Sequence, residues 1–161
     1  NMSVNLSYQQ FLEGDLTSFV RDTLKEVDLS PSNLTLELTE SYFVKEDAIV
    51  RETLESFQKM GVRVAMDDFG VGYSSLSMLK HIPADIVKID RGFVKGITTD
   101  LFNATFIRSI TELCNDVGKQ VCLEGVETKE EYGSVGNMGL RLIQGFYFGR
   151  PVPAEKFFEN L

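Results

Sequence analysis

Short runs of apolar and β-branched residues alternate with longer amphipathic stretches along the whole chain. Six of these runs have the length of strands, and they cover residues 3–6, 34–38, 63–66, 85–89, 120–123 and 141–144. Parallel strands need a crossover between them, usually a helix, so the alternation predicts right-handed βαβ units around one parallel sheet. The periodicity fits an open doubly wound sheet and a barrel equally well.

Two of the intervening stretches have a clear helical period. The apolar positions are Val50, Leu54 and Phe57 in the first, and Phe102, Phe106, Ile110, Leu113 and Val117 along one face of the second. The stretches stop at Gly61 and Gly118, where left-handed C-caps are expected. Thr128 and Glu131 have the spacing of a capping box, which predicts a further helix start.

Composition narrows the class of protein. The 161 residues suffice for one domain with a hydrophobic core, and no apolar run is long enough to span a membrane. No signal peptide opens the chain, so we expect a cytoplasmic location. The net charge of -8 argues against binding a DNA or RNA polymer, which requires a basic surface. Cys114 and Cys122 lack metal-ligand spacing and are interpreted as reduced core thiols.

Polar side chains stand at or just after the end of every predicted strand. They are Asn5, Glu37, Glu40, Asp67, Asp68, Lys88, Asp90, Glu124, Glu127 and Gln144. The carboxyl ends of parallel strands form the site in α/β folds, and in barrels they converge on one mouth. A single acid at such a position is usually a helix N-cap or a solvated loop residue. The recurrence at six strands therefore indicates a shared site.

The residue types at these strand ends restrict the chemistry. Carboxylate and amide oxygens suit Mg²⁺ or Mn²⁺, and the one histidine, His81, is interpreted as a turn residue rather than a zinc ligand. Asp67 and Asp68 are the natural centre of a two-ion site, which favours in-line phosphoester hydrolysis. Such ions would let an acidic pocket hold a phosphorylated ligand. Lys88 either balances charge in the core or orients or deprotonates the attacking water.

Residues 67–76 follow a strand and contain two glycines, Gly70 and Gly72. A lone Gly-x-Gly is a weak indication of a phosphate loop, and the segment lacks the lysine of a Walker loop and the third glycine of a dinucleotide fingerprint. We therefore expect a mobile loop over the metal site, with glycines that permit backbone changes.

Six short motifs occur in order over almost the whole chain. They are Val-Asn-Leu-Ser at 4–7, Glu-Leu-Thr-Glu at 37–40, Asp-Asp-Phe-Gly at 67–70 with Gly-Tyr-Ser-Ser-Leu at 72–76, Val-Lys-Ile-Asp at 87–90, Glu-Gly-Val-Glu-Thr at 124–128, and Gln-Gly-Phe-Tyr-Phe at 144–148 followed by Arg150 and Pro151. Together they resemble the signature motifs of EAL domains. The resemblance implies a TIM-like (β/α) barrel that acts in bacterial signalling, including biofilm and motility regulation. It further implies a cyclic-guanylate-specific phosphodiesterase, which hydrolyses cyclic di-GMP to linear pGpG with two Mg²⁺ or Mn²⁺ ions.

The resemblance assigns metal-binding roles to four residues. The implied ligands are Asn5, Glu37, Asp67 and Asp68. Asp67 is expected to bridge the two ions, and Asp68 to help hold the second.

Catalytic or supporting roles are implied for Lys88, Glu124, Gln144, Glu40 and Glu127. Lys88 takes the position of the general base or water-orienting residue. Glu124 and Gln144 match positions that hold Lys88 and a water at the metals. Glu40 matches the glutamate that anchors the loop after Asp68, and Glu127 has a supporting position. No residue is assigned to substrate binding.

Two departures from the family pattern stand out. Val71 replaces the threonine usual between the loop glycines. The Glu-Ala-Leu motif, whose glutamate is a metal ligand, belongs to a strand before the one that holds Asn5, and this chain contains neither that motif nor the phosphate-gripping arginine that follows it. Residues 1–161 are accordingly expected to form strands three to eight of the barrel, an incomplete barrel with six of eight strands.

An unclosed barrel leaves two sheet edges and an interior face exposed. We therefore expect a truncated chain, a proteolytic fragment, or a homo-oligomer in which another copy closes the gap. The resemblance is compatible with an upstream sensor or GGDEF domain in the parent protein, and with a membrane anchor there.

Three functions remain open at this point. The first is cyclic di-GMP hydrolysis by the parent protein, with this fragment weakly active or inactive alone. The alternatives are a non-catalytic cyclic di-GMP receptor and a dimerisation or scaffold module. Because a pure receptor needs no general base, the retained acids and Lys88 favour catalysis.

Overall fold

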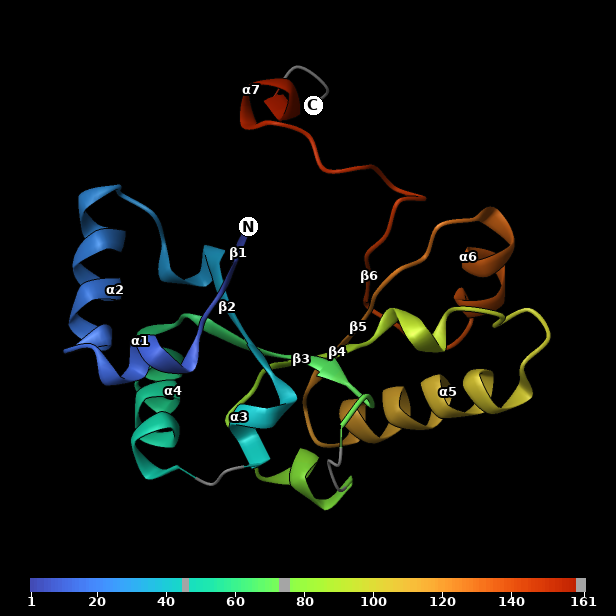
Figure 1. The fold of residues 1–161 in the computed structure, drawn as a ribbon, viewed down its shortest axis with the longest axis horizontal. Helices are drawn as coiled ribbons and strands as arrows, with labels where there is room; N and C mark the ends of the chain where they lie inside the picture. Colours follow the sequence, from blue (N-terminus) through green and yellow to red (C-terminus); the bar gives the residue numbers. More distant parts are fainter. Residues whose placement is uncertain (45–46, 73–75, 159–161) are drawn as a thin grey trace.

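A computed structural model describes residues 1–44, 47–72 and 76–158 as a six-stranded parallel sheet flanked by helices (Figure 1). The strands are β1 (Met2–Asn5), β2 (Leu34–Thr39), β3 (Arg63–Phe69), β4 (Ile86–Ile89), β5 (Gln120–Leu123) and β6 (Leu142–Ile143). They lie side by side in chain order, and every neighbouring pair is parallel. The βαβ organisation predicted from the alternation is therefore confirmed.

Most of the helices lie in the connections between successive strands, whereas the described residues between β3 and β4 hold only a 3₁₀ turn, and the last helix follows β6. The helices are α1 (Tyr8–Leu12), α2 (Leu16–Glu26), α3 (Glu40–Val44), α4 (Ala48–Met60), α5 (Leu101–Asp116), α6 (Lys129–Val135) and α7 (Ala154–Phe158), with 3₁₀ turns η1 (Pro31–Asn33), η2 (Leu76–Lys80) and η3 (Arg91–Phe93). None of the helices in the described ranges is long and apolar enough to cross a membrane. Figure 1 shows α7 at the end of an extended segment, apart from the other helices.

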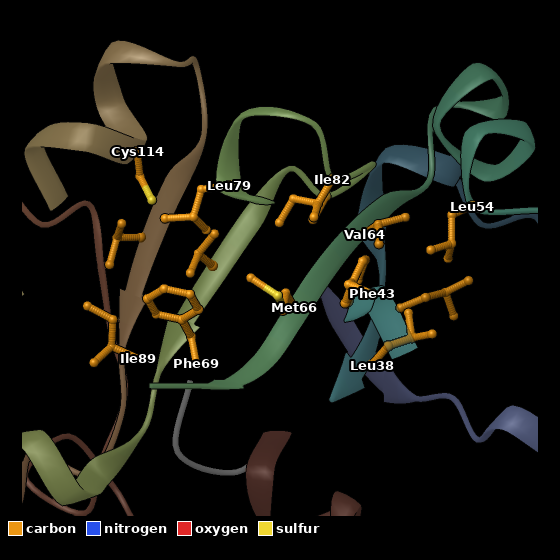
Figure 2. Close-up of a cluster of buried hydrophobic side chains, with 14 of the residues drawn as sticks. Leu38, Phe43, Leu54, Val64, Met66, Phe69, Leu79, Ile82, Ile89 and Cys114 are labelled. Atoms are coloured by element: carbon orange, nitrogen blue, oxygen red, sulfur yellow. The ribbon is translucent and has the colours of Figure 1, made fainter. Parts of the chain in front are cut away.

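One face of the sheet packs against the helices and forms the main core. Leu38, Met66, Val87, Ile89 and Leu123 project from the strands on this face, and each is at most 1% exposed. Figure 2 shows several of these side chains packed with residues of the helices and loops. Since burial of such a side chain contributes about 1.5–3 kcal/mol, this face supplies most of the hydrophobic stabilisation.

The opposite, inner face carries a different set of residues. Residues paired across a parallel ladder point to the same face, as do residues two apart along a strand. Asn5 pairs with Glu37, Glu37 with Ala65, and Lys88 with Cys122. Glu124 follows Cys122 by two positions, so the strand-end polar residues share the inner face. Beneath them, Ala65, Ile86 and Cys122 form a small apolar cluster of their own.

A β-bulge interrupts the end of β3. Met66 pairs with Val87 and Phe69 pairs with Ile89, so three steps along β3 match two along β4. Asp68 lies inside the bulge and has a positive φ of 58°, which is uncommon for a residue with a side chain. The extra residue returns Phe69 to the helix-covered face, where it is 3% exposed.

The helix boundaries follow local signals. Gly61 ends α4 with a φ of 92°, and Gly118 lies just beyond α5 with a φ of 77°, as expected for left-handed C-caps. Thr128 and Glu131 form the predicted capping box at the start of α6. Val50, Leu54 and Phe57 are the buried residues of α4, as predicted.

The predicted apolar face of α5 is wrong in part. The buried residues of this helix are Ile107, Ile110, Thr111 and Cys114. Phe102 is 71% exposed and Val117 is 36% exposed, although both belong to the predicted apolar face. The Thr111 hydroxyl donates to the Ile107 carbonyl at 2.7 Å, so this polar residue is buried without an unsatisfied group.

Candidate metal centre

A groove of about 720 Å³ runs along the inner face of the sheet. Its floor includes Ser3, Thr35, Glu37, Arg63, Ala65, Ile86, Lys88 and Cys122. The segment after β6 contributes Gln144, Phe146, Val152 and Phe157 to the lining. The carboxyl ends of the strands thus place Glu37, Lys88 and Gln144 in one hollow.

Lys88 is the central residue of the cluster at the end of this groove. Its Nζ lies 2.6 Å from Glu37 Oε2, 2.8 Å from Glu124 Oε1 and 3.1 Å from Asp67 Oδ1. The side chain of Lys88 is 7% exposed, and those of the three acids are 12–19% exposed. The Lys88 ammonium donates a hydrogen bond to Glu37 Oε2 from β2, and Asp67 at the end of β3 and Glu124 after β5 complete a set of three ion pairs around it.

The electrostatics of the cluster keep Lys88 charged. Burial alone would lower the pKa of the Lys88 ammonium, but its hydrogen bonds to Glu124 and Glu37 outweigh burial and raise this pKa well above its usual value. Burial raises the pKa of Glu124, although the hydrogen bond from Lys88 opposes the change. Burial, followed by repulsion from Asp67, also raises the pKa of Asp68. Burial therefore disfavours the charged forms of Glu124 and Asp68 even with the Lys88 ammonium nearby.

Asp67, Asp68 and Glu124 form a candidate cation site. One oxygen of each carboxylate lies within 4.8 Å of the others. The bulge in β3 produces this convergence, because Asp67 stays on the inner face while Asp68 turns through its left-handed backbone. The Asp68 amide also donates to Asp67 Oδ1 at 3.0 Å. Oxygen donors clustered in this way match the preference of Mg²⁺ and Mn²⁺.

Glu40 lies behind this turn and is 5% exposed. Its Oε2 accepts a hydrogen bond from the Gly70 amide at 3.1 Å. A Cβ atom at Gly72 would lie 2.5 Å from Glu40 Oε1, so only glycine fits there without displacing the carboxylate. Tyr73, Ser74 and Ser75, which belong to the loop expected to be mobile, lie outside the described residues.

The other residues singled out from the sequence differ in position. Asn5 is exposed at the end of β1 and faces the same way as Glu37, its ladder partner. Gln144 is also exposed and lines the groove with Lys88. Glu127 is exposed, and its amide donates to Glu131 in the cap of α6. Asp90 caps η3 by accepting a hydrogen bond from the Gly92 amide at 2.8 Å, which explains its place after β4.

The donor set fits a divalent-cation centre on chemical grounds. The described cluster offers carboxylate oxygens from Glu37, Asp67, Asp68 and Glu124, and one ammonium, Lys88, as internal countercharge. Carboxylates outnumber the single lysine in this cluster, and divalent cations neutralise negative charge at such a site.

Phe93 contacts the site loop but carries no signal in the sequence. It belongs to η3, and a Cβ atom at Gly70 would lie 2.6 Å from its Cε2 atom. The contact joins segments more than 20 positions apart, and neither a hydrophobic period nor a motif predicts such packing. Of this contact, the sequence indicated only the glycine: Gly70 has a φ of 97°, a conformation that residues with side chains rarely adopt.

Comparison with known proteins gives a consistent family match. The family model described as the EAL domain matches residues 1–151. The chain is 39% identical over 161 residues to the bifunctional diguanylate cyclase/cyclic di-GMP phosphodiesterase MucR of Pseudomonas aeruginosa. The match covers 100% of this chain and 24% of that relative, so the chain spans about a quarter of its length.

Solved structures share the fold. The structure of the PaMucR phosphodiesterase in complex with c-di-GMP superposes with a TM-score of 0.88 at 40% identity, covering 98% of this chain and 64% of that one. The manganese and cyclic di-GMP complex of Klebsiella pneumoniae BlrP1 gives a TM-score of 0.86 at 33% identity, covering 92% of this chain and 38% of that one. These matches confirm the predicted TIM-like (β/α) barrel, of which this chain forms six parallel strands.

Proposed function

Because the chain belongs to the EAL domain family, we propose that it is the part of a cyclic di-GMP phosphodiesterase domain that carries strands three to eight of the barrel. The observation that supports this most directly is the cluster in which Lys88 meets Glu37, Asp67 and Glu124 at distances of 2.6–3.1 Å. The reaction is hydrolysis of cyclic di-GMP to linear pGpG. The proposed cofactors are Mg²⁺ or Mn²⁺, and MucR and BlrP1, with which this chain shares its fold, have been solved with cyclic di-GMP.

Four residues are proposed as metal ligands: Asn5, Glu37, Asp67 and Asp68. Divalent cations held there would supply Lewis-acid polarisation of a phosphate oxygen and a bound water of lowered pKa. Glu124 converges with Asp67 and Asp68 and is proposed to share in holding this centre. Glu40 supports the ligands indirectly, through its hydrogen bond to the Gly70 amide.

Lys88 is proposed to orient the reacting groups as an ammonium. In this state it donates hydrogen bonds and has no lone pair with which to accept a proton. The general-base role would require loss of a proton that three neighbouring carboxylates stabilise. Gln144 lines the same groove and is proposed to take part in positioning a water molecule beside Lys88.

The 161-residue chain by itself is proposed to be weakly active or inactive, since the glutamate of the Glu-Ala-Leu motif is not in its sequence. Hydrolysis then belongs to the longer polypeptide, in which a cyclase or sensor domain is a candidate neighbour, as in the bifunctional MucR.

Hydrolysis of cyclic di-GMP by the full-length protein in Mg²⁺ or Mn²⁺ tests the proposal. Asp67→Asn and Lys88→Ala should each lower the rate by at least about two orders of magnitude, because they remove a metal ligand and the group that organises the acids. Asp22→Asn and Lys59→Ala make the same kinds of change at exposed positions on α2 and α4 and should leave the rate unchanged. Wild-type turnover by both site variants would disprove the role assignments. Binding of cyclic di-GMP without any turnover by the wild type would instead establish a receptor.

A further inference from the structure

Gly70 is packed against an aromatic ring in addition to its hydrogen bond to Glu40. A Cβ atom built on it would lie 2.6 Å from Phe93 Cε2, 2.8 Å from Phe93 Cζ and 3.2 Å from Phe106 Cζ. Real side chains do not approach so closely, so the Gly70 backbone is in direct contact with the Phe93 ring. Its φ of 97° independently requires glycine.

Phe93 is in turn held by helix α5. Its ring stacks on Phe106 with a centroid separation of 4.1 Å and an interplanar angle of 10°. Phe106 also lies 6.3 Å from Phe69, the residue that ends the bulge. The next residue along the helix, Ile107, is fully buried and fixes α5 to the sheet. The stack therefore connects a rigid helix to the turn that follows Asp67 and Asp68.

Hydrogen bonds also support the turn in the part of the chain described: the Asp68 amide donates to Asp67 Oδ1 at 3.0 Å, and Phe69 pairs with Ile89 of β4. The Gly70 amide donates to Glu40, and the Val71 amide donates to the Asp68 carbonyl at 3.3 Å. Asp68 has a positive φ, a conformation that surrounding contacts must maintain in a residue with a side chain. Gly70 is thus contacted both by the Glu40 carboxylate, through its amide, and by the Phe93 ring, at its α-carbon.

We propose that Phe93 is a positioning residue, which presses on Gly70 and keeps the turn from Asp68 to Gly70 in the conformation that directs Asp67 and Asp68 toward Glu124. The metal-binding part of this inference rests on the proposed function. In this role Phe93 acts through the backbone of the turn.

Two measurements test the inference, one of them independent of metal. In the full-length protein, hydrogen exchange followed by mass spectrometry reports on the amides of residues 68–72. Phe93→Ala should make these amides exchange about tenfold faster or more, because the turn opens more often without its aromatic support. Phe93→Leu, which keeps most of the volume, should give an effect of the same sign if alanine fails to fold.

Manganese affinity provides the second measurement, by electron paramagnetic resonance of free Mn²⁺. Phe93→Ala should weaken Mn²⁺ binding by about 10- to 100-fold, as do other changes behind a metal-ligand shell. Phe19→Ala is the matched control, since it removes the same ring from α2 at a position that is 67% exposed. Leu54→Ala controls for lowered stability, because Leu54 is 1% exposed and Figure 2 shows it well apart from Phe69. Both controls should keep wild-type Mn²⁺ affinity.

The outcomes separate this inference from the proposed function. Unchanged exchange at 68–72 in both Phe93 variants, with wild-type Mn²⁺ affinity, would overturn the positioning role and leave the enzyme assignment standing. Faster exchange in a protein whose wild type binds no Mn²⁺ would support the positioning of the turn and contradict the metal site. Equal loss of affinity in Leu54→Ala would mean that Phe93 contributes only to general stability, which also overturns the inference.

Discussion

Lys88 shows how a buried charge can be tolerated when several strands supply its partners. Three carboxylates surround its ammonium, and none of the four side chains is more than 19% exposed. Removal of one member of such a group leaves uncompensated charges in a poorly solvated place. The lysine is consequently important for the fold as well as for the proposed chemistry.

The substitution Lys88→Met is expected to destabilise the protein by about 3–5 kcal/mol at pH 7, measured by urea unfolding. Burial already raises the pKa of Glu124, and loss of the opposing hydrogen bond raises it further. An acid whose folded-state pKa is raised destabilises the fold above that pKa. The difference in free energy of unfolding between the wild type and Lys88→Met should therefore shrink as the pH falls toward 5. Lys59→Met, at an exposed position, should change stability by less than about 0.5 kcal/mol. A loss of stability in Lys88→Met that grows on acidification would contradict this electrostatic account.

The two cysteines are expected to be unreactive in the folded protein. Burial raises the pKa of the Cys114 thiol to about 11 and that of Cys122 to about 12. At pH 8, a thiol with a pKa of about 11 is ionised in about one molecule in a thousand, and only the thiolate reacts. Iodoacetamide at pH 8 should therefore label both residues in urea and neither in buffer, as read by mass spectrometry. Rapid labelling of native Cys122 would mean that the reagent reaches this thiol from the groove and that burial does not protect it.

The residue types at the site were predictable from the sequence, whereas their geometry was not. The recurrence of polar side chains at strand ends correctly indicated that Glu37, Asp67, Lys88 and Glu124 share one place. The positive φ of Asp68 follows from a bulge, and a bulge depends on how β3 pairs with β4. Pairing between strands has no signature within either strand alone, so sequence patterns do not reveal it.

At the scale of elements, strands were easier to predict than helix faces. The run at 120–123 matches β5, whereas β3 extends to Phe69 and β6 shrinks to Leu142–Ile143. The face of α5 was misplaced in part because Phe102 was counted among its apolar positions, whereas the buried Thr111 was not. Aromatic residues at the edge of this helix instead join the stack with Phe93.

The capping box of α6 offers a test at this scale. Thr128→Ala removes the side-chain oxygen that accepts from the Glu131 amide, and should lower the free energy of unfolding by about 1 kcal/mol. Thr53→Ala, inside α4, should have a smaller effect, because alanine favours a helix interior. Thermal unfolding of the two variants under identical conditions compares them. A larger loss for Thr53→Ala would show that the cap contributes little.

The whole molecule is two-sided: one face of the sheet is covered by helices and the other is a groove. Among the described residues, β1 and β6 are the edges of the sheet. Apolar side chains near these edges remain exposed, including Val4 at 43%, Phe146 at 46% and Phe157 at 54%. Unpaired strand edges with apolar neighbours are templates for association with another chain.

The isolated 161-residue chain should therefore self-associate. Size-exclusion chromatography with light scattering should give a mass above that of the monomer, in a concentration-dependent manner. Val4→Lys, which places a charge on the β1 edge, should reduce the association, whereas Lys59→Met on α4 should not. A monodisperse monomer across the concentration range would exclude this behaviour.

The extra residue in β3 also bears on how such a sequence can change length over generations. Side chains alternate between the two faces of a strand, so a shift of one residue moves every following side chain to the opposite face. Deleting one residue between Arg63 and Met66 would put core side chains of β3 into the groove and would turn its polar side chains toward the helix-covered face. Insertions and deletions should therefore accumulate among relatives in the connections, such as the stretch around Gly14, where the space is open. Within the strands, the number of residues between the site residues should stay constant among relatives, because it determines which side chains face the site.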